Sequence, residues 1–420
     1  MYSLYLHIPF CTHRCAYCDF NTYAGQESLV PAYVDALRSE IEAAGRGAGR
    51  TLELGTVFFG GGTPSLLTPS QFESILETIS THFRLLPEAE LTLEANPGTV
   101  SADELRRLRQ SGMNRISFGV QSANPEELRM LERVHSFGDV INAVKWARQA
   151  GFDNLNLDLI YGLPEQTLGH WQTSVERILA LRPEHLSLYA LTLEHGTPFG
   201  RWASRGLLPL PDPDLAADMY EWASEILAKN GYVQYEISNW ALDMDRGPRI
   251  ADRKPIHSDE SLRFMVRRPP SLACKHNLQY WRNLDYLGLG AGAHGYANGV
   301  RYSNVLRIKT YIERLSNLQY PLSTLSFPLT PATVNHHKNS QREDMQETMM
   351  TGLRLTIEGV SAAGFEQRFG AYLTDVFGKE IEELLGLGLL EWVAESLRLT
   401  ERGRLLGNQV FMRFVGEGRK

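Results

Sequence analysis

Three cysteines stand within eight positions near the start of the chain, in the run Cys11-Thr-His-Arg-Cys15-Ala-Tyr-Cys18. Structural zinc sites usually take four ligands, often as two separated pairs. Three thiolates in one loop suit three corners of a 4Fe–4S cubane, as short-spaced cysteine runs do in ferredoxins. The alternatives are a zinc site completed by His13 or His7, and a chance cluster. We expect the three cysteines to be iron–sulfur ligands.

Three thiolates leave one iron of such a cluster without a protein ligand. An open iron can take the amino and carboxylate groups of S-adenosylmethionine. One electron passed into the sulfonium then splits a carbon–sulfur bond and leaves a 5′-deoxyadenosyl radical. The cysteine spacing therefore predicts a redox-active cluster with S-adenosylmethionine as a second cofactor.

Composition limits the class of protein. The chain has 420 residues, 43% of them hydrophobic and 22% charged, which allows a large core and at least one further domain. A net charge of -7 does not suggest that the protein coats nucleic acid. Four cysteines are too few for a secreted disulfide scaffold, and the N-terminus lacks a signal-peptide pattern. Because no apolar run approaches bilayer length, we expect a soluble cytoplasmic protein, with peripheral membrane contact left open.

Residues 1–241 repeat one pattern, in which a β-rich run ends in a polar or glycine-rich turn and a helical stretch follows. The runs are SLYLHIPF, LGTVFFGG, ELTLEANP, NRISFGVQ, LNLDLIYGLP and HLSLYAL. Such alternation predicts a parallel sheet with right-handed crossovers. Six units are fewer than the eight of a closed barrel, so we predict an α/β fold with a partial (β/α)6 TIM-like barrel.

Polar and glycine residues fall at or just beyond the carboxyl ends of these six runs. They are Cys11, Gly60–Gly62, Glu94, Gln121, Asp158 and Tyr189. In parallel α/β folds this rim is where ligands bind. A single such residue could merely cap a helix, but six in register predict a ligand site.

The pattern changes after the barrel. Residues 242–273 are rich in Arg, Asp and Pro with little periodicity, which predicts a flexible insertion. A connecting segment, 274–325, precedes a small, mainly helical, winged-helix-like domain at 326–420. There GFEQRFG, KEIEELLGLGLLEWV and RLLGNQVFMRFV are expected to be helices and SLRLTERG a strand and turn. Because this domain is not notably basic, a structural or docking role is favoured over DNA binding.

Three longer runs carry a family resemblance: YLHIPFCTHRCAYCDF, FFGGGTPS and NLDLIYGLPEQT. Together they resemble the radical S-adenosylmethionine superfamily and, more narrowly, the oxygen-independent coproporphyrinogen III dehydrogenase family. The resemblance covers most of the chain, including the C-terminal domain. It implies the cluster, the cofactor and the partial barrel.

The resemblance also implies a set of cofactor contacts. They are Tyr5, Tyr17, Gly61, Gly62, Thr63, Glu94, Gln121, Arg133 and Asp158. The tyrosines flank the cluster, and the glycines, which lack Cβ atoms, let the backbone approach the methionine end of the cofactor. The acidic and amide side chains hydrogen-bond the cofactor. Arg133 pairs with its carboxylate, a geometry that suits a guanidinium.

Three features separate this chain from the dehydrogenase itself. The enzyme carries a further cysteine two residues after the third, and here that position is Phe20. The enzyme also has a long segment ahead of the cluster, whereas the first strand is expected within a few residues of Met1. Finally, residues 276–281 read HNLQYW, and HNxxYW resembles the signature of a haem-chaperone branch of the family.

The HNLQYW segment has the residue types for haem. His276 offers an imidazole for the iron, while Tyr280 and Trp281 offer flat apolar faces to the macrocycle. Cys274 and His294 are alternative contacts, and a packed core segment would give the same pattern.

The resemblance therefore implies a haem-binding chaperone that passes haem to an unidentified acceptor protein. The alternatives are a coproporphyrinogen III dehydrogenase, which Phe20 disfavours, and a radical S-adenosylmethionine methyltransferase, which the HNLQYW segment disfavours. Whether the protein is an enzyme stays open at this point.

Overall fold

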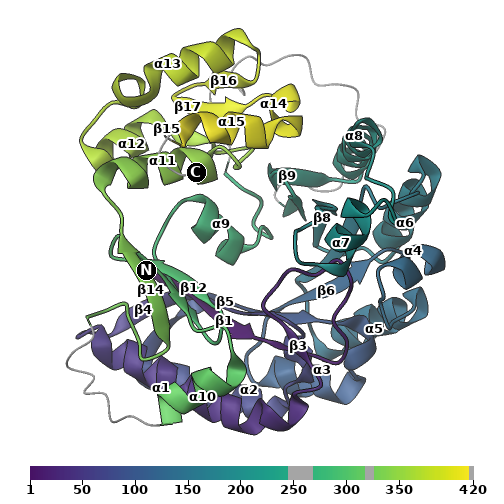
Figure 1. Cartoon of the computed structure of the whole chain (residues 1–420), viewed down its shortest axis with the longest axis vertical. Helices are drawn as coiled ribbons and strands as arrows, with labels where there is room; N and C mark the ends of the chain where they lie inside the picture. The colour runs from purple at the N-terminus through teal and green to yellow at the C-terminus, as the bar shows by residue number, and fades with distance from the viewer. Residues whose placement is uncertain (245–267, 317–325, 416–420) are drawn as a thin grey trace. The chain divides into compact units, whose positions relative to one another are not determined.

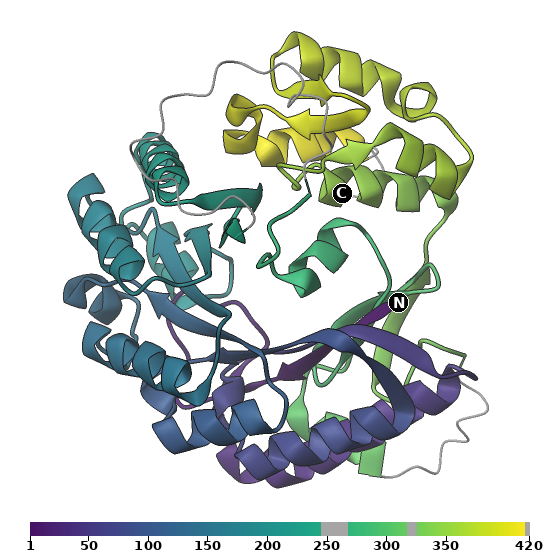
Figure 2. The same cartoon turned by 180° about the vertical axis from the view of Figure 1, so that it is seen from behind.

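The computed structural model describes residues 1–244, 268–316 and 326–415 (Figures 1 and 2). The insertion expected at 242–273 falls largely outside the described residues. In the described part of the chain, no helix is both long and apolar enough to cross a bilayer.

Two compact units alternate along the chain. The first comprises Met1–Tyr220 and Asp285–Lys338, and the second comprises Glu221–Leu284 and Asn339–Lys420. The sequence predicts consecutive segments instead. Residues 285–338 belong to the first unit because their first strand pairs with the N-terminal strand.

Six parallel strands form the centre of the first unit's sheet and follow one another in chain order (Figure 1). They are β1 (Tyr2–Ile8), β4 (Leu52–Gly61), β5 (Phe83–Ala95), β6 (Arg115–Gln121), β7 (Leu155–Tyr161) and β8 (His185–Ala190). Each strand pairs in parallel with the next. This order confirms the predicted partial (β/α)6 barrel.

Helices follow the strands, and those that connect one strand to the next lie along the outer face of the curved sheet, whereas the last one packs on the cysteine loop (Figures 1 and 2). They are α1 (Val30–Gly47), α2 (Pro69–His82), α3 (Ala102–Gln110), α4 (Pro125–Met130), α5 (Phe137–Ala150), α6 (Leu168–Ala180) and α7 (Pro198–Ser204). Single 3-10 turns are η1 (Glu27–Leu29), η2 (Pro64–Leu66) and η3 (Pro97–Thr99). The pairs Thr68/Gln71 and Ser101/Glu104 form capping boxes at the starts of α2 and α3. An N-cap side chain typically contributes about 1 kcal/mol, which helps to fix where each rim loop ends.

The sheet extends beyond the six predicted strands. β11 (Tyr286–Leu289) pairs in parallel with β1. β12 (His294–Ala297), β13 (Val300–Asn304) and β14 (Thr333–Lys338) continue the sheet in antiparallel register, and α10 (Ile308–Ser316) lies between the last two in sequence. The sequence did not predict these strands, because they are short and several are broken by glycines.

A buried carboxylate ties this extension to α1. Glu40 is fully buried and accepts hydrogen bonds from Gly290 N (2.7 Å), Asn304 Nδ2 (2.7 Å), Tyr311 OH (2.6 Å) and Thr330 Oγ1 (2.7 Å). A buried carboxylate is tolerated only when it is satisfied in this way. Removing it would leave four donors without their acceptor, so Glu40 holds α1, β13 and α10 in place.

The second unit combines a hairpin, a short helix and a C-terminal helical bundle with a small sheet. The first part contains β9 (Tyr232–Glu236), β10 (Asn239–Leu242) and α9 (Lys275–Trp281), and the boundary between the units falls inside α8 (Pro213–Lys229). The C-terminal part contains α11 (Gln341–Gly352), β15 (Val360–Ser361), α12 (Ala362–Phe369), α13 (Leu373–Gly386), β16 (Leu390–Val393), β17 (Ser396–Leu399), α14 (Glu401–Leu405) and α15 (Gly407–Phe414). The order β15-β17-β16 in an antiparallel sheet suits the predicted winged-helix-like fold.

Two helix boundaries in this unit differ from the prediction. The run KEIEELLGLGLLEWV is not one helix: α13 ends at Gly386, Gly388 takes a left-handed φ of 67°, and Leu390–Val393 forms β16. The run RLLGNQVFMRFV divides into α14 and α15 at Leu406. A leucine-rich sequence is compatible with both helix and strand. The segment after Gly388 is a strand because it pairs with β17.

The short strands β2 (Phe10–Cys11) and β3 (Tyr23–Ala24) complete the first unit. They pair in parallel, and Tyr23 N donates to Pro9 O at 2.8 Å. Residues 10–24 thus form a closed loop that contains all three clustered cysteines, with Cys11 in β2 itself.

Candidate functional site

The cysteine loop begins immediately after β1. Cys11 is buried, whereas Cys15 and Cys18 are partly exposed. A turn holds the second and third cysteines close in the backbone, because Cys18 N donates to Cys15 O at 3.1 Å. The three thiols therefore come from one short loop at the carboxyl end of the first barrel strand, as the sequence predicts.

The turn after β4 packs directly against Cys11. Gly62 N donates to Ile8 O (2.9 Å), and Thr63 N donates to Phe10 O (2.7 Å). Thr63 Oγ1 also donates to Cys11 Sγ at 3.6 Å. Burial raises the pKa of the Cys11 thiol, and the Thr63 hydroxyl opposes that rise. The two loops thus form one packed structure around the first thiol.

Close packing explains the glycines of the GGGTP turn. A Cβ atom on Gly62 would lie 2.5 Å from Phe10 O and 3.1 Å from Cys11 Sγ. Gly61 has φ 113°, and a Cβ there would lie 2.5 Å from the His7 ring. The family resemblance assigns these glycines to the approach of the cofactor. The protein's own loops already require them, so their presence is not by itself a sign of a ligand.

Acidic side chains lie behind that turn. Glu94, next to last in β5, accepts a hydrogen bond from Gly61 N at 3.1 Å. Burial, followed by the nearby Asp158 carboxylate, raises the pKa of Glu94 to about 7. Asp158 accepts from Asn156 Nδ2 (2.6 Å) and Ser117 Oγ (3.1 Å). Burial raises the pKa of Asp158 as well, against those hydrogen bonds.

The strand positions support the predicted rim with one correction. Cys11 follows β1, Gly61 ends β4, Gln121 ends β6 and Tyr189 is next to last in β8. Asp158 does not lie at a strand end, because it occupies the fourth of seven positions in β7. It faces the site from within the barrel, where its partners are strand residues and not loop residues.

The end of α4 brings Arg133 to the cysteine loop. Glu132 adopts a left-handed φ of 52° just after the helix. The amides of Glu132 and Arg133 donate to the carbonyls of Arg129 (3.0 Å) and Leu128 (2.9 Å), which reverses the chain as left-handed helix ends do. Arg133 Nη1 then donates to Cys15 Sγ at 3.7 Å.

Arg133 retains an unused donor. Its Nη2 donates to Gly119 O at 2.8 Å, while its Nε is buried and has no hydrogen-bond partner among the described residues. A Cβ atom on Gly119 would lie 2.9 Å from Gln121 Nε2 and 3.4 Å from Arg133 Nη2, so this glycine makes room for both side chains. Gln121 itself has φ 68°. The arrangement can take an anionic group beside Cys15.

The two predicted tyrosines lie on either side of the loop. Tyr5 OH is bonded to His7 Nδ1 at 2.9 Å. Tyr17, between the second and third cysteines, packs its ring 6.5 Å from that of Phe199. Burial raises the pKa of both phenols, so both are neutral hydrogen-bonding groups at ordinary pH.

The geometry disfavours the zinc alternative. Both ring nitrogens of His7 are engaged, one with Tyr5 OH and the other with Asn21 O at 2.9 Å. His13 Nε2 contacts Glu132 Oε2 at 3.1 Å. Within the described ranges, no three His, Cys, Asp or Glu side chains converge as one metal ion would need. A cubane attaches each thiolate to a different iron, so it does not require such convergence.

Asn21 is a site residue that sequence reasoning missed. Its Nδ2 donates to Ala291 O (3.0 Å) and to Leu306 O (3.0 Å), and its carbonyl contacts His7. Gly292, with φ 80°, leaves no room for a Cβ atom beside this amide. Asn21 therefore clamps the end of the cysteine loop to the β11–β13 extension. No sequence signal distinguishes it from an ordinary loop asparagine.

The HNLQYW segment forms α9 in the second unit. His276 is 1% exposed, and its Nε2 is bonded to Tyr280 OH at 2.8 Å, one helical turn away. The two rings meet edge to face, with centroids 4.9 Å apart. Cys274, the N-cap residue, is also buried. His294 is exposed on β12 in the first unit. The described arrangement thus resembles the packed core segment more than an open axial ligand.

Trp281 differs from the other two motif residues. The Arg354 guanidinium carbon lies 4.3 Å from the Trp281 ring centroid, and Arg354 also pairs with the buried Glu236 at 3.6 Å. The Trp281 indole Nε1 is buried and lacks a hydrogen-bond partner among the described residues. Arg354 therefore covers one face of the Trp281 ring, and the indole N–H is not accessible to a ligand in this arrangement.

Comparisons with known proteins agree with this arrangement. Residues 5–178 match the family model described as the Radical SAM superfamily, and residues 339–406 match the HemN C-terminal domain. The heme chaperone HemW of Bacillus subtilis (strain 168) is 37% identical over 99% of this chain and 100% of its own length. The heme chaperone HemW of Escherichia coli (strain K12) is 34% identical over 99% of this chain and 98% of its own.

A solved structure shares the fold across the same length. Coproporphyrinogen III oxidase (HemN) from Escherichia coli superimposes with a TM-score of 0.75, covering 98% of this chain and 89% of that one. The sequences are 24% identical, so this likeness supports the fold alone.

Proposed function

Because this chain belongs to the family of the heme chaperone HemW, we propose that it binds haem and passes it to an acceptor protein. The observation that carries the proposal is similarity to a heme chaperone over the whole length of both chains, 99% and 100%. That similarity includes α9 and the C-terminal domain as well as the barrel.

We further propose that Cys11, Cys15 and Cys18 hold a 4Fe–4S cluster whose open iron binds S-adenosylmethionine. When bound and reduced, such a cluster supplies single electrons. The residues present fit it: three thiols stand on one loop, and Arg133 donates to Cys15 Sγ at 3.7 Å. Thr63 donates to Cys11 Sγ at 3.6 Å. Both contacts place positive charge or polar hydrogen beside a thiolate, which stabilises its charged form.

The surrounding side chains would bind S-adenosylmethionine by complementary chemistry. The Arg133 guanidinium, which lies beside Cys15, would pair with the carboxylate of the cofactor. The backbone N–H groups of Gly61, Gly62 and Thr63 already donate within the protein, so these residues would offer their carbonyl oxygens near the methionine end of the cofactor. The remaining proposed contacts are Tyr5 and Tyr17, and the polar residues Glu94, Gln121 and Asp158.

The dehydrogenase is the alternative with the same fold. Phe20 stands where that enzyme carries a further cysteine, and its side chain is 62% exposed. An exposed phenylalanine cannot bind metal, which supports a chaperone over a decarboxylase. We propose that S-adenosylmethionine, if used, serves haem handling and not porphyrinogen oxidation.

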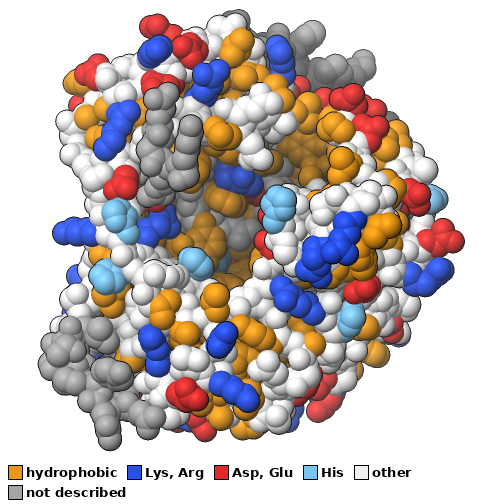
Figure 3. Space-filling view, viewed as in Figure 1, with side chains coloured by type: hydrophobic (Ala, Val, Ile, Leu, Met, Phe, Trp, Pro, Cys, Tyr) orange, Lys and Arg blue, Asp and Glu red, His pale blue; other side chains and the backbone are white. Residues whose placement is uncertain are grey.

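The setting of this function is proposed to be the cytoplasm, where reducing conditions keep the thiols available to the cluster. Nucleic acid is not a proposed partner. Positive and negative side chains are interspersed over much of the face shown in Figure 3, which supports that view. Peripheral membrane contact remains compatible with delivery to a membrane acceptor.

Anaerobic reconstitution followed by a haem titration tests the proposal. The expected result is saturable binding with a change in the visible haem spectrum. In parallel, the reconstituted protein is incubated with coproporphyrinogen III, S-adenosylmethionine and a reductant, and no decarboxylated product is expected. Absence of saturable haem binding would refute the chaperone proposal. Two vinyl groups formed per porphyrinogen over many turnovers would establish the dehydrogenase instead.

A further inference from the structure

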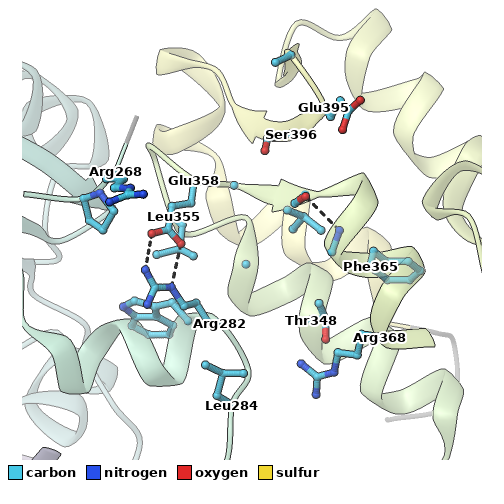
Figure 4. A pocket seen from close by; sticks show the side chains of 18 residues that line it. Arg268, Arg282, Leu284, Thr348, Leu355, Glu358, Phe365, Arg368, Glu395 and Ser396 are labelled. Carbon is cyan, nitrogen blue, oxygen red and sulfur yellow. Dashed lines mark hydrogen bonds and ion pairs between the residues drawn. The ribbon is translucent and has the colours of Figure 1, made fainter. Parts of the chain in front are cut away.

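A pocket of about 960 Å³ opens within the second unit beside the HNLQYW helix (Figure 4). Its wall combines the carboxyl end of α9 with residues of α11, α12 and the β16–β17 turn. Trp281, Leu355 and Phe365 supply apolar surface, and Leu284, 39% exposed, lies on the same lining. Ligand pockets of about 300–1,000 Å³ with mainly apolar walls commonly take a flat molecule of drug or cofactor size.

Three arginines line this apolar pocket. They are Arg268, Arg282 and Arg368, against the carboxylates of Glu358 and Glu395. Arg282 is held by Glu358 through Nε (2.9 Å) and Nη2 (2.5 Å), as Figure 4 shows. Arg268 has no ion-pair partner among the described residues. A guanidinium with free donors binds a carboxylate in preference to most other groups.

Arg368 is fixed from behind the pocket. Its Nη1 donates to Asn283 O at 2.8 Å, and its Nη2 contacts Asp344 Oδ2 at 3.3 Å. These contacts orient the guanidinium and pair its charge with Asp344. The Trp281 indole adds apolar ring surface to the same lining, while its Nε1 is buried. The pocket therefore offers an apolar wall with several N–H donors, which suits a planar apolar molecule that carries carboxylates.

Strong iron ligands are missing from this wall. The described residues that line the pocket include no His, Cys, Met or Tyr. His276 and Tyr280, the candidate ligands of α9, are bonded to each other and do not line it. A metalloporphyrin bound here would be held by its ring and its carboxylates, and its iron would remain open to ligands from another protein.

We propose that this pocket binds haem through its two carboxylates and its apolar ring, without an iron ligand from the pocket wall. The inference rests on the proposed haem-chaperone function and specifies its site. Binding that does not use the iron suits transfer, because an acceptor's ligand can take the iron before the carboxylates are released. It also predicts that the iron-free porphyrin binds as haem does.

Titrations of the full chain with three probes test this inference. The probes are haem, iron-free protoporphyrin IX and the dimethyl ester of that porphyrin, in which both carboxylates are masked. Wild type is expected to bind the first two with similar affinity and the ester at least about tenfold more weakly, since hydrogen bonds to charged groups are lost. Protein that binds haem but not iron-free protoporphyrin would overturn the inference and leave the proposed function intact.

Substitutions in the pocket test whether haem binds there or elsewhere on the chain. Arg268→Gln is expected to weaken haem and protoporphyrin about tenfold each, and Ser396→Trp, which fills the pocket, to weaken both further. Arg413→Gln is the matched control, because Arg413 pairs with Glu383 at 3.8 Å and does not line the pocket. Thermal unfolding checks that each variant folds. Unchanged affinity in a folded Ser396→Trp protein would overturn the inference. If wild type binds neither haem nor protoporphyrin, the proposed function fails together with it.

Discussion

The cysteine loop and the HNLQYW helix each gather residues of metal-binding type, yet the fold treats them in opposite ways. On the loop, Cys15 and Cys18 remain partly exposed, and Arg133 reaches Cys15 with a donor still unused. On α9, His276 is buried, and its Nε2 forms a hydrogen bond with Tyr280 OH. Spacing in a loop leaves side chains available to a ligand, whereas spacing of four on a helix lets two side chains satisfy each other.

Loss of a loop thiol is expected to have the largest effect. Cys15→Ala should lose nearly all of its 4Fe–4S content after anaerobic reconstitution, because a second iron would then lack a thiolate. Iron and sulfide analysis, with the paramagnetic signal of the reduced protein, measures this. Cys274→Ala is the matched control and should reconstitute fully, since Cys274 is a buried residue of α9's N-cap. Equal cluster content in Cys15→Ala and wild type would contradict the ligand assignment.

Substitution of Arg133 tests whether the guanidinium beside Cys15 binds S-adenosylmethionine. Arg133→Ala should weaken S-adenosylmethionine binding about 10- to 100-fold, the range of one lost charge-assisted pair. Arg133→Lys should recover only part of that affinity, because an ammonium keeps the charge but lacks the planar fork of donors that matches a carboxylate. Calorimetric titration of reconstituted protein measures both. Arg129→Ala, one turn earlier and exposed, should bind normally; a similar loss in both variants would show a general effect on α4.

Substitution of His276 tests whether the HNLQYW helix α9 uses this histidine for packing or for binding iron. In the described packing, His276→Ala should lower the free energy of unfolding by about 1–3 kcal/mol, because the variant loses a fully buried ring and its hydrogen bond with Tyr280 OH. The haem spectrum and affinity should change little. Chemical denaturation and haem titration give the two readouts. Tyr280→Phe is the matched control and should cost less. A shifted haem spectrum with unchanged stability would instead identify His276 as the iron ligand.

A smaller effect is expected from Glu94, whose pKa is raised from 4.5 to about 7. The folded state holds this proton more tightly than the unfolded state, so the stability of cofactor-free protein should fall as pH rises from 4.5 to 7 and then level off. The loss should be on the order of 1 kcal/mol, because the side chain is partly exposed. Denaturation at several pH values measures the slope. Glu94→Gln should flatten it, whereas Glu77→Gln, exposed on α2, should not.

Much of the first unit was predictable because its signals are local. β-rich runs separated by amphipathic helices gave the six parallel strands in their correct order. The position of the polar and glycine residues at one rim could be predicted too, since the carboxyl ends of parallel strands lie on one side of the sheet. Asp158 was placed wrongly because a strand's length cannot be read from its polar residues alone; β7 continues for three residues beyond it.

The second unit was less predictable, because its elements depend on distant partners. β16 was mistaken for helix, and only its pairing with β17 distinguishes it from the leucine-rich α13. The strands β11–β14 were not predicted at all. They exist because β1 offers an open edge and because Glu40 binds four groups from that extension.

The sequence by itself determined the cysteine spacing, the alternation that builds the barrel and the residue types of the HNLQYW motif. These depend on neighbours in the chain, whose geometry the backbone fixes. Only the tertiary structure decided that His276 turns inward to Tyr280, that Asn21 clamps the cysteine loop, and that arginines far apart in sequence line one pocket with Trp281. Such outcomes depend on which groups meet in space and on whether a buried polar atom finds a partner there, and spacing along the chain carries no information about either.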